Sequence, residues 1–248
     1  MNRIMLSVPG FFAALAVAPA FGAVSYHDLA GGYTPSSYVT GPTSADQNGA
    51  NGTYALVDYD TGLPTGTSLT VSDVINHSNG GTWALNGDAA TLFPGSDVIN
   101  YSNMNYLGNP GTHTYTFTGL TAGLIYDVAI YADRNYAPDH ANAGRSATFT
   151  LGGASSFINT SSTGNAGVLS IDGASVTLQN GSNSWGNVAR WSDIVVDESG
   201  TITITITGNG YSGNVLRLES AIIPEPASAA MAGIGALGLL LRRRSRQA

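Results

Sequence analysis

Alternation of apolar and polar residues with a period of two is the feature that most constrains how this chain of 248 residues can fold. Over residues 201–207, three isoleucines alternate with four threonines, so an extended strand there has one apolar and one polar face. The same alternation recurs over residues 114–118, 124–130, 147–151 and 216–219. No long segment between the two ends of the chain shows an apolar period of 3.6 residues, so the pattern predicts antiparallel sheets with one solvated face.

Turns rich in glycine and asparagine separate these strands. The turn signals lie at residues 119–123, 152–153, 172–173, 180–181, 198–200 and 208–210. Short strands divided in this way predict an all-β fold, an antiparallel β-sandwich. Further strands are expected near residues 54–59 and 68–75, and no linker divides residues 24–222, which we interpret as one domain.

Charge is scarce and unevenly distributed. The chain has no lysine. It also has no cysteine, and this absence excludes a disulfide framework and any cysteine-based metal or catalytic site. Between residues 23 and 223, four arginines stand against fifteen acidic residues, a net charge of −11. Because such a surface repels phosphate, we expect no nucleic-acid partner.

The first 23 residues have the three parts of a secretory signal peptide. Arg3 supplies a positive start, residues 11–18 supply an apolar run, and Ala18, Ala20 and Gly22 supply the small residues that signal peptidase requires. We expect cleavage and export, which the absence of cysteine allows because a domain of this size can bury a core without disulfides. The alternatives are a permanent membrane anchor or a buried helix.

Residues 223–248 form a second composite signal at the other end of the chain. Pro224, Glu225 and Pro226 precede an apolar stretch over residues 227–241, and four arginines follow: Arg242, Arg243, Arg244 and Arg246. A helix of fifteen residues rises only ~22 Å against a hydrocarbon core of ~30 Å, so it anchors weakly. The arginines are expected to stay in the cytoplasm, with the body outside. A plain single-pass anchor is the alternative.

This tail resembles the PEP-CTERM sorting signal, in which Pro-Glu-Pro, a short apolar helix and an arginine cluster occur in that order. The residue before Pro224 is Ile223, where the family usually has valine. The resemblance implies that an exosortase, a membrane-embedded transpeptidase, cuts near Pro-Glu-Pro. It also implies a location at the cell surface or outside the cell, with anchoring in the inner membrane that is transient or permanent.

The body resembles exported PEP-CTERM proteins that have a galactose-binding-like jelly roll. The resemblance spans about residues 54–222 and rests on scaffold segments: residues 117–120 with 126–128, residues 197–204 and residues 215–218. It implies a jelly-roll sandwich, a fold that often binds carbohydrate. No ligand-contact residue carries over, and a fold by itself does not establish a ligand.

The densest polar cluster of the body lies in a loop between two strong strands. Its members are Asp133, Arg134, Asp139, His140 and Arg145. Loops at the end of a sandwich commonly hold binding sites, and Arg134 or His140 could contact a sugar or a carboxylate. The alternative is a solvated loop whose charges pair locally.

Aromatic residues offer a second candidate surface, a platform for sugar rings. The candidates are Trp83, Trp185, Trp191, Tyr101, Tyr106 and Tyr136. Trp and Tyr combine apolar area with a polar group, which suits a sugar. Trp191 lies within an alternating strand and is expected in the core, whereas Trp185 follows a turn and is the better exposed candidate.

Calcium is the one cofactor that the sequence suggests. Asp58 and Asp60 alternate ahead of Gly62, and Asp193, Asp197 and Glu198 cluster near the 201–207 strand. Carboxylate oxygens suit calcium, but the first segment lacks the later glutamate of a complete calcium loop. Ordinary turn chemistry is the alternative.

Motifs for catalysis are absent from the sequence. The four histidines form no His-Glu-x-x-His motif, and there is neither a Gly-x-Ser-x-Gly elbow nor a glycine-rich phosphate loop. The sequence therefore predicts an exported, non-catalytic surface or matrix protein, with binding of extracellular polysaccharide as the sharper hypothesis. An exported hydrolase that acts on polysaccharide is one alternative, since a pair of carboxylates can be assembled in space. A purely structural surface protein is the other.

Overall fold

The computed structural model describes residues 22–29, 38–42, 51–74, 76–79, 84–96, 98–99, 101–108 and 110–222. The predicted signal segment up to residue 21, the tail from residue 223 onward and Trp83 lie outside the described residues. The two flanking helices therefore stay predictions. Within the described part, no helix is long and apolar enough to cross a membrane.

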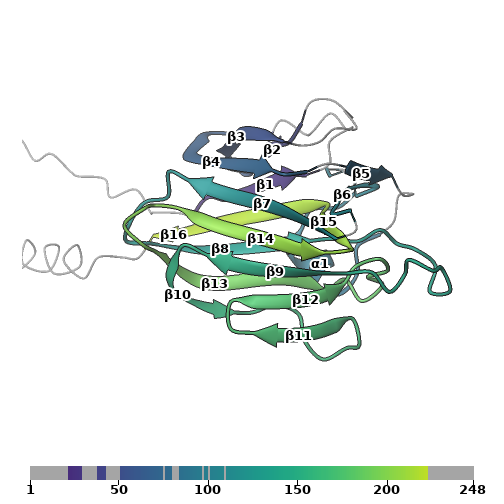
Figure 1. Cartoon of the computed structure of the whole chain (residues 1–248). Helices are drawn as coiled ribbons and strands as arrows, with labels where there is room; N and C mark the ends of the chain where they lie inside the picture. Colours follow the sequence, from purple (N-terminus) through teal and green to yellow (C-terminus); the bar gives the residue numbers. More distant parts are fainter. Residues whose placement is uncertain are drawn as a thin grey trace, which may run out of the picture.

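Two sheets account for most of the fold (Figure 1). The six-stranded sheet has the order β10 (Ala154–Asn159), β13 (Val188–Val196), β8 (Leu124–Tyr131), β16 (Val215–Ile222), β1 (Val24–Asp28) and β2 (Val39–Thr40). The seven-stranded sheet has the order β11 (Val168–Asp172), β12 (Ser175–Gln179), β9 (Ser146–Gly152), β14 (Ile202–Gly208), β7 (Gly111–Thr118), β4 (Pro64–Ser72) and β3 (Gly52–Val57).

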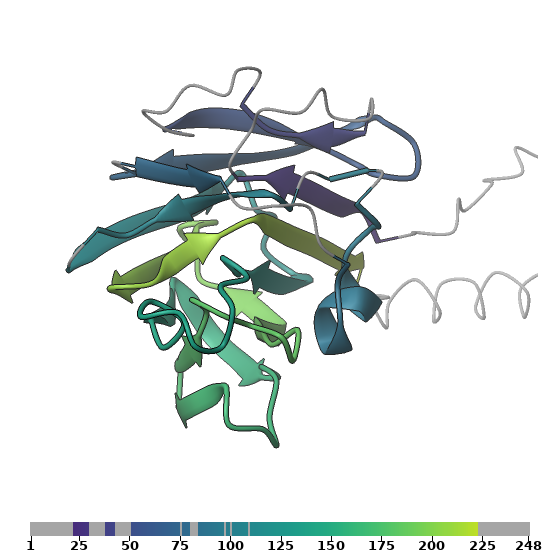
Figure 2. The same cartoon turned by 90° about the vertical axis from the view of Figure 1, so that its right-hand side faces the viewer.

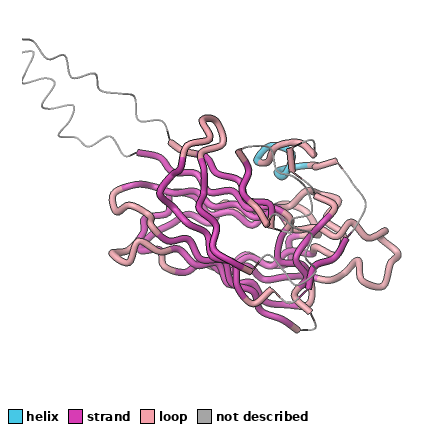
Figure 3. Tube along the Cα trace, turned by 90° about the horizontal axis from the view of Figure 1, so that it is seen from above, coloured by secondary structure: helices cyan, strands magenta, loops and turns pink. Residues whose placement is uncertain are grey.

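Neighbouring strands in both sheets are antiparallel, except for the parallel pair β1–β2. A small third sheet joins β15 (Tyr211–Gly213), β6 (Asn103–Tyr106) and β5 (Asn76–Asn79), and a short helix, α1, spans Gly87–Leu92. Figure 3 shows how strands dominate the body. The predicted antiparallel sandwich is confirmed, whereas the jelly-roll subtype stays a prediction.

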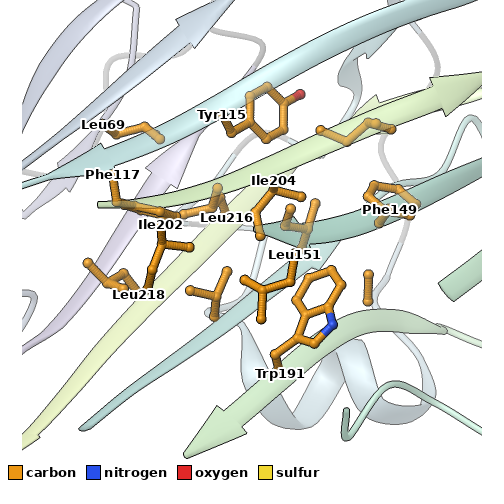
Figure 4. Close-up of a cluster of buried hydrophobic side chains, with 14 of the residues drawn as sticks. Leu69, Tyr115, Phe117, Phe149, Leu151, Trp191, Ile202, Ile204, Leu216 and Leu218 are labelled. Atoms are coloured by element: carbon orange, nitrogen blue, oxygen red, sulfur yellow. The ribbon is translucent and has the colours of Figure 1, made fainter. Parts of the chain in front are cut away.

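Alternating side chains of the two sheets meet in one core. Ile202, Ile204 and Ile206 of β14 are fully buried, as the alternation over residues 201–207 predicts. They pack with residues of the facing sheet, including Leu216, Leu218 and Trp191 (Figure 4). Burial of such side chains stabilises the fold by roughly 1.5–3 kcal/mol each. Trp191 lies in this core, where its Nε1 donates to the carbonyl of Ala174 at 3.0 Å.

A second apolar cluster covers part of the outer face of the six-stranded sheet. The short helix α1 lies beside the sheet (Figure 2). Its Ala89 and the following Phe93 pack against Ala129, Tyr131 and Val215. For this reason the last residues of β8 are buried on both faces, and the apolar–polar alternation of the strand ends at Val128.

The pairing of β8 with β16 defines two ends of the sandwich. Leu124 lies opposite Ile222 at one end, and Tyr131 lies opposite Val215 at the other. Seven residue steps separate the two, roughly 24 Å at the rise of a strand. β1 begins beside Glu219, so both termini of the described body leave from the Leu124 end, which we call the proximal pole. The loop over residues 132–145 follows Tyr131 at the other end, the distal pole (Figure 1).

Two histidines are buried within the body. His27 Nδ1 lies 2.9 Å from Thr40 Oγ1, and His113 Nδ1 lies 2.6 Å from Ser212 Oγ. Burial lowers the pKa of His27 to about 3 and that of His113 to about 4. Below the unfolded pKa of about 6.5, the unfolded chain takes up protons at these positions and the folded chain does not. Their contribution to stability is therefore complete above pH 6.5 and is lost as the pH falls toward 4.

We predict that His113→Gln reduces the acid sensitivity of the fold. Between pH 7.5 and 4.5 the free energy of unfolding should fall by about 2.5 kcal/mol less in the variant than in the unmodified chain, because the variant lacks one of the two groups. Urea unfolding at both pH values measures the difference. Equal losses in the two proteins would show that His113 is not held neutral by burial.

Candidate functional site

Asp133 fixes the start of the long loop at the distal pole. Its Oδ1 accepts from the backbone N–H groups of Asn135 at 2.7 Å and Asn183 at 2.9 Å, and its Oδ2 accepts from the Tyr131 hydroxyl at 3.2 Å. The side chain is buried, and this burial raises the pKa of Asp133 to about 6 despite these hydrogen bonds. Asp133 therefore ties the 132–145 loop to the 180–187 segment and is not available as a ligand contact.

Buried asparagine amides hold the loops of this pole together. Asn214 Nδ2 donates to the backbone carbonyls of Tyr101, Asn103 and Asp133 at 2.8–3.2 Å, and its Oδ1 accepts from the Asp133 N–H at 2.7 Å. Asn180 Nδ2 donates to the backbone carbonyl of Tyr211, and Asn180 Oδ1 accepts from the Tyr211 N–H. Buried backbone N–H and C=O groups need hydrogen-bond partners, and loops lack the strand pairing that would supply them. These side-chain amides provide the missing partners.

Aromatic rings and cations meet on the outside of this scaffold. The Tyr136 and His140 rings are stacked, with centroids 3.9 Å apart. The Arg134 guanidinium lies 4.9 Å from the Tyr136 ring, and that of Arg145 lies 5.0 Å from the Tyr106 ring, distances that allow cation–π attraction. We call these five residues the distal tyrosine surface.

Tyr211 lies beneath this surface and joins its two halves. Its ring centroid is 5.4 Å from that of Tyr106, and its hydroxyl is 3.5 Å from the Tyr136 hydroxyl. That hydrogen bond lowers the pKa of Tyr136, and the charges of Arg134 and Arg145 lower it further. Rings and positive charges of three separate segments therefore act as one unit.

The structure brings some of the predicted site residues together and separates the others. Arg134, His140 and Arg145 come together, whereas Asp139 is exposed on the same loop and Asp133 is buried. Among the aromatic candidates, Tyr106 and Tyr136 join this surface, but Tyr101 and Trp191 are fully buried. Trp185 is 39% exposed and lies over Gly167, outside the distal tyrosine surface.

A pocket beside α1 has no counterpart among the sequence predictions. Its volume is about 170 Å³, and its lining consists of Asp88, Thr91, Leu92, Thr160, Ser162, Val188 and Arg190. We call it the α1 pocket. Because its residues come from segments up to a hundred positions apart, no local motif marks it.

Hydrogen bonds define the walls of the α1 pocket. Ser162 Oγ donates to Asp88 Oδ2 at 2.5 Å, and Arg190 Nη2 forms an ion pair with Asp127 Oδ2 at 2.9 Å. The 180–187 segment contacts both α1 and the distal loop. The Gly186 carbonyl accepts from Ala89 N–H of α1, and the Asn183 N–H donates to Asp133. Gly186 has φ of +68°, and a Cβ there would lie 1.8 Å from the Asn86 carbonyl oxygen, so only glycine permits this approach.

The segment predicted to bind calcium forms a hydrogen-bonded turn at the proximal pole. Asp58 Oδ1 accepts from Thr61 N–H at 2.9 Å and from the Thr61 hydroxyl at 2.6 Å, and Oδ2 accepts from Val24 N–H at 3.1 Å. Burial acts to raise the pKa of Asp58, but these hydrogen bonds outweigh it and the pKa is lowered. In the described part of the chain, no three His, Asp or Glu side chains gather closely enough to hold a metal ion. A calcium site at Asp58 and Asp60 stays a prediction.

Comparison with known proteins identifies the C-terminal segment. Residues 223–244 match the family described as the PEP-CTERM protein-sorting motif, so the sorting motif predicted at the C-terminus is confirmed. The match includes Pro224, Glu225 and Pro226, whereas Arg246 lies beyond it. This motif implies a protein that is exported, processed by an exosortase and sorted to the cell surface. No curated protein and no solved structure matches the chain.

We predict that Asn214→Ala destabilises the fold by about 3 kcal/mol, because it removes four buried hydrogen bonds, three to backbone carbonyls and one from the Asp133 N–H. Asn209→Ala is the matched control, since the Asn209 side chain is exposed and accepts one hydrogen bond from Ser146 N–H. The control should change the free energy of unfolding by less than about 0.5 kcal/mol. Equal effects in urea unfolding would refute the scaffold role of Asn214.

Proposed function

We propose that the chain is an exported, non-catalytic surface or matrix protein that binds extracellular polysaccharide through the distal tyrosine surface. One observation carries this proposal: the tyrosines and arginines of this surface lie at the pole opposite the exit of the sorting motif. A protein held through its C-terminal tail would present that pole away from the membrane. Residues 24–222, with a jelly-roll subtype like that of galactose-binding modules, would form the binding unit.

The chemistry of the surface suits a glycan. Tyrosine rings offer flat apolar faces to the C–H side of a sugar ring, while the hydroxyls and the cationic groups bond its oxygens. The buried asparagine amides fix the loops that carry the rings. The side chains of the surface therefore lose little conformational freedom when a ligand binds. In addition, two of the four arginines in this acidic body lie here, which favours contacts with electronegative groups of a ligand.

A hydrolase that acts on polysaccharide is a weaker alternative. Asp133 has the raised pKa expected of a general acid, but its oxygens are taken up by hydrogen bonds within the fold and the side chain is 2% exposed. Release of reducing ends by the purified protein would support the hydrolase. A protein that shows no binding and no turnover would instead be a structural coat protein.

Binding to a panel of soluble polysaccharides tests the proposal. Tyr136→Ala, and the double variant Arg134→Ala with His140→Ala, should each weaken binding about tenfold, because each removes part of the stacked surface. Tyr38→Ala is the matched control: Tyr38 is 42% exposed but lies against Gly62 at the proximal pole. Unchanged affinity in the first two variants, or an equal loss in the control, would overturn the assignment.

A further inference from the structure

We propose that the α1 pocket is a second binding site, which takes a single neutral sugar ring. The pocket is separate from the distal tyrosine surface, so the inference does not depend on polymer binding there. Three properties of its lining support it: size, hydrogen-bonding groups and charge.

The size of the pocket fits one ring. A volume of about 170 Å³ is similar to that of cavities of ~150 Å³ that hold benzene, which is also a six-membered ring. A pyranose with its hydroxyls has a comparable size, whereas an oligosaccharide chain does not fit. Leu92, which is only partly buried, adds apolar area to the lining for the C–H face of the ring.

The polar groups of the pocket match vicinal hydroxyls. The Asp88 carboxylate accepts one hydrogen bond from Ser162, which leaves its other oxygen to accept from a ligand hydroxyl. Thr91 and Thr160 place two further hydroxyls in the lining, and both residues are exposed to solvent. A polyol supplies donors and acceptors at the spacing that such a mixed lining requires, and hydrogen bonds to a carboxylate are the stronger kind.

The charge of the pocket selects against anions. Arg190 lines the pocket, but its charge is balanced by the ion pair with Asp127. Asp88, Arg190 and the paired Asp127 together leave a net charge of −1 around the pocket, which would repel a uronate or a phosphate. The ligand class is therefore a neutral sugar, either free or as the end unit of a glycan.

Saturation-transfer NMR and titration of the full chain in a non-glycosidic detergent test this site. The probes are the methyl glycosides of glucose, galactose and mannose, with glucuronate as the charged probe and a disaccharide glycoside to separate an end unit from a free ring. We expect at least one neutral glycoside to bind and glucuronate to bind at least about tenfold more weakly, because Asp88 opposes its charge.

Two variants of the pocket should lose the glycoside. Thr91→Trp fills the cavity from an exposed position on α1, and Asp88→Asn removes the charged acceptor and should weaken binding about tenfold. Asp60→Asn is the control, an exposed acid at the proximal pole that should have no effect. Tyr136→Ala should leave glycoside binding intact even if it abolishes polymer binding, which separates the two sites.

Three results would overturn the inference: none of the neutral glycosides binds, binding survives both pocket variants, or only glucuronate binds. Binding of the disaccharide with the same dependence on Asp88 would place the end unit of a glycan in the pocket. Binding of the monosaccharide glycoside alone would assign it to free sugars.

Discussion

The pairing of β16 between β1 and β8 is the constraint on which the rest of the structure depends. It places the strand that leads into the sorting motif at the centre of the six-stranded sheet, beside the strand that follows the predicted signal peptide. Both ends of the body consequently leave from one pole, and the loop after β8 is directed to the other. Such an arrangement lets one folded unit be held by its tail while its distal loops face outward.

Hydrogen bonds of buried asparagine side chains stabilise the distal loops of this body, where ion pairs or disulfides could otherwise do so. The chain has no cysteine, and few ion pairs occur in the part of it that the structure describes. The distal loops are instead held by asparagines such as Asn214 and Asn180, whose side chains bond backbone groups far away in the sequence. Hydrogen bonds in such a buried network reinforce one another, and each member left unpaired is costly. The same network connects the loop of the distal tyrosine surface to the 180–187 segment and, through Gly186, to α1.

The strands were predictable because their apolar period is local. The alternation over residues 201–207 reappears as the buried isoleucines of β14, and Trp191 lies in the core as its strand position indicates. The distal tyrosine surface was predictable only in part. Arg134, His140 and Arg145 could be grouped from the sequence because they share one loop. The placement of Tyr211, the α1 pocket and the hydrogen bond from Asn183 to Asp133 all join segments far apart in the sequence, so no local pattern could indicate them.

Intact mass and terminal sequencing of the protein recovered from its native cell surface or medium test the central claim most directly. If the chain is exported and sorted, the mature protein should begin near Val24 and end near Pro226. Both cuts would leave β1 and β16 whole, because β1 begins at Val24 and β16 ends at Ile222. A protein whose tail still ends at Ala248 would contradict processing at the sorting motif and would leave a membrane-anchored β-sandwich instead.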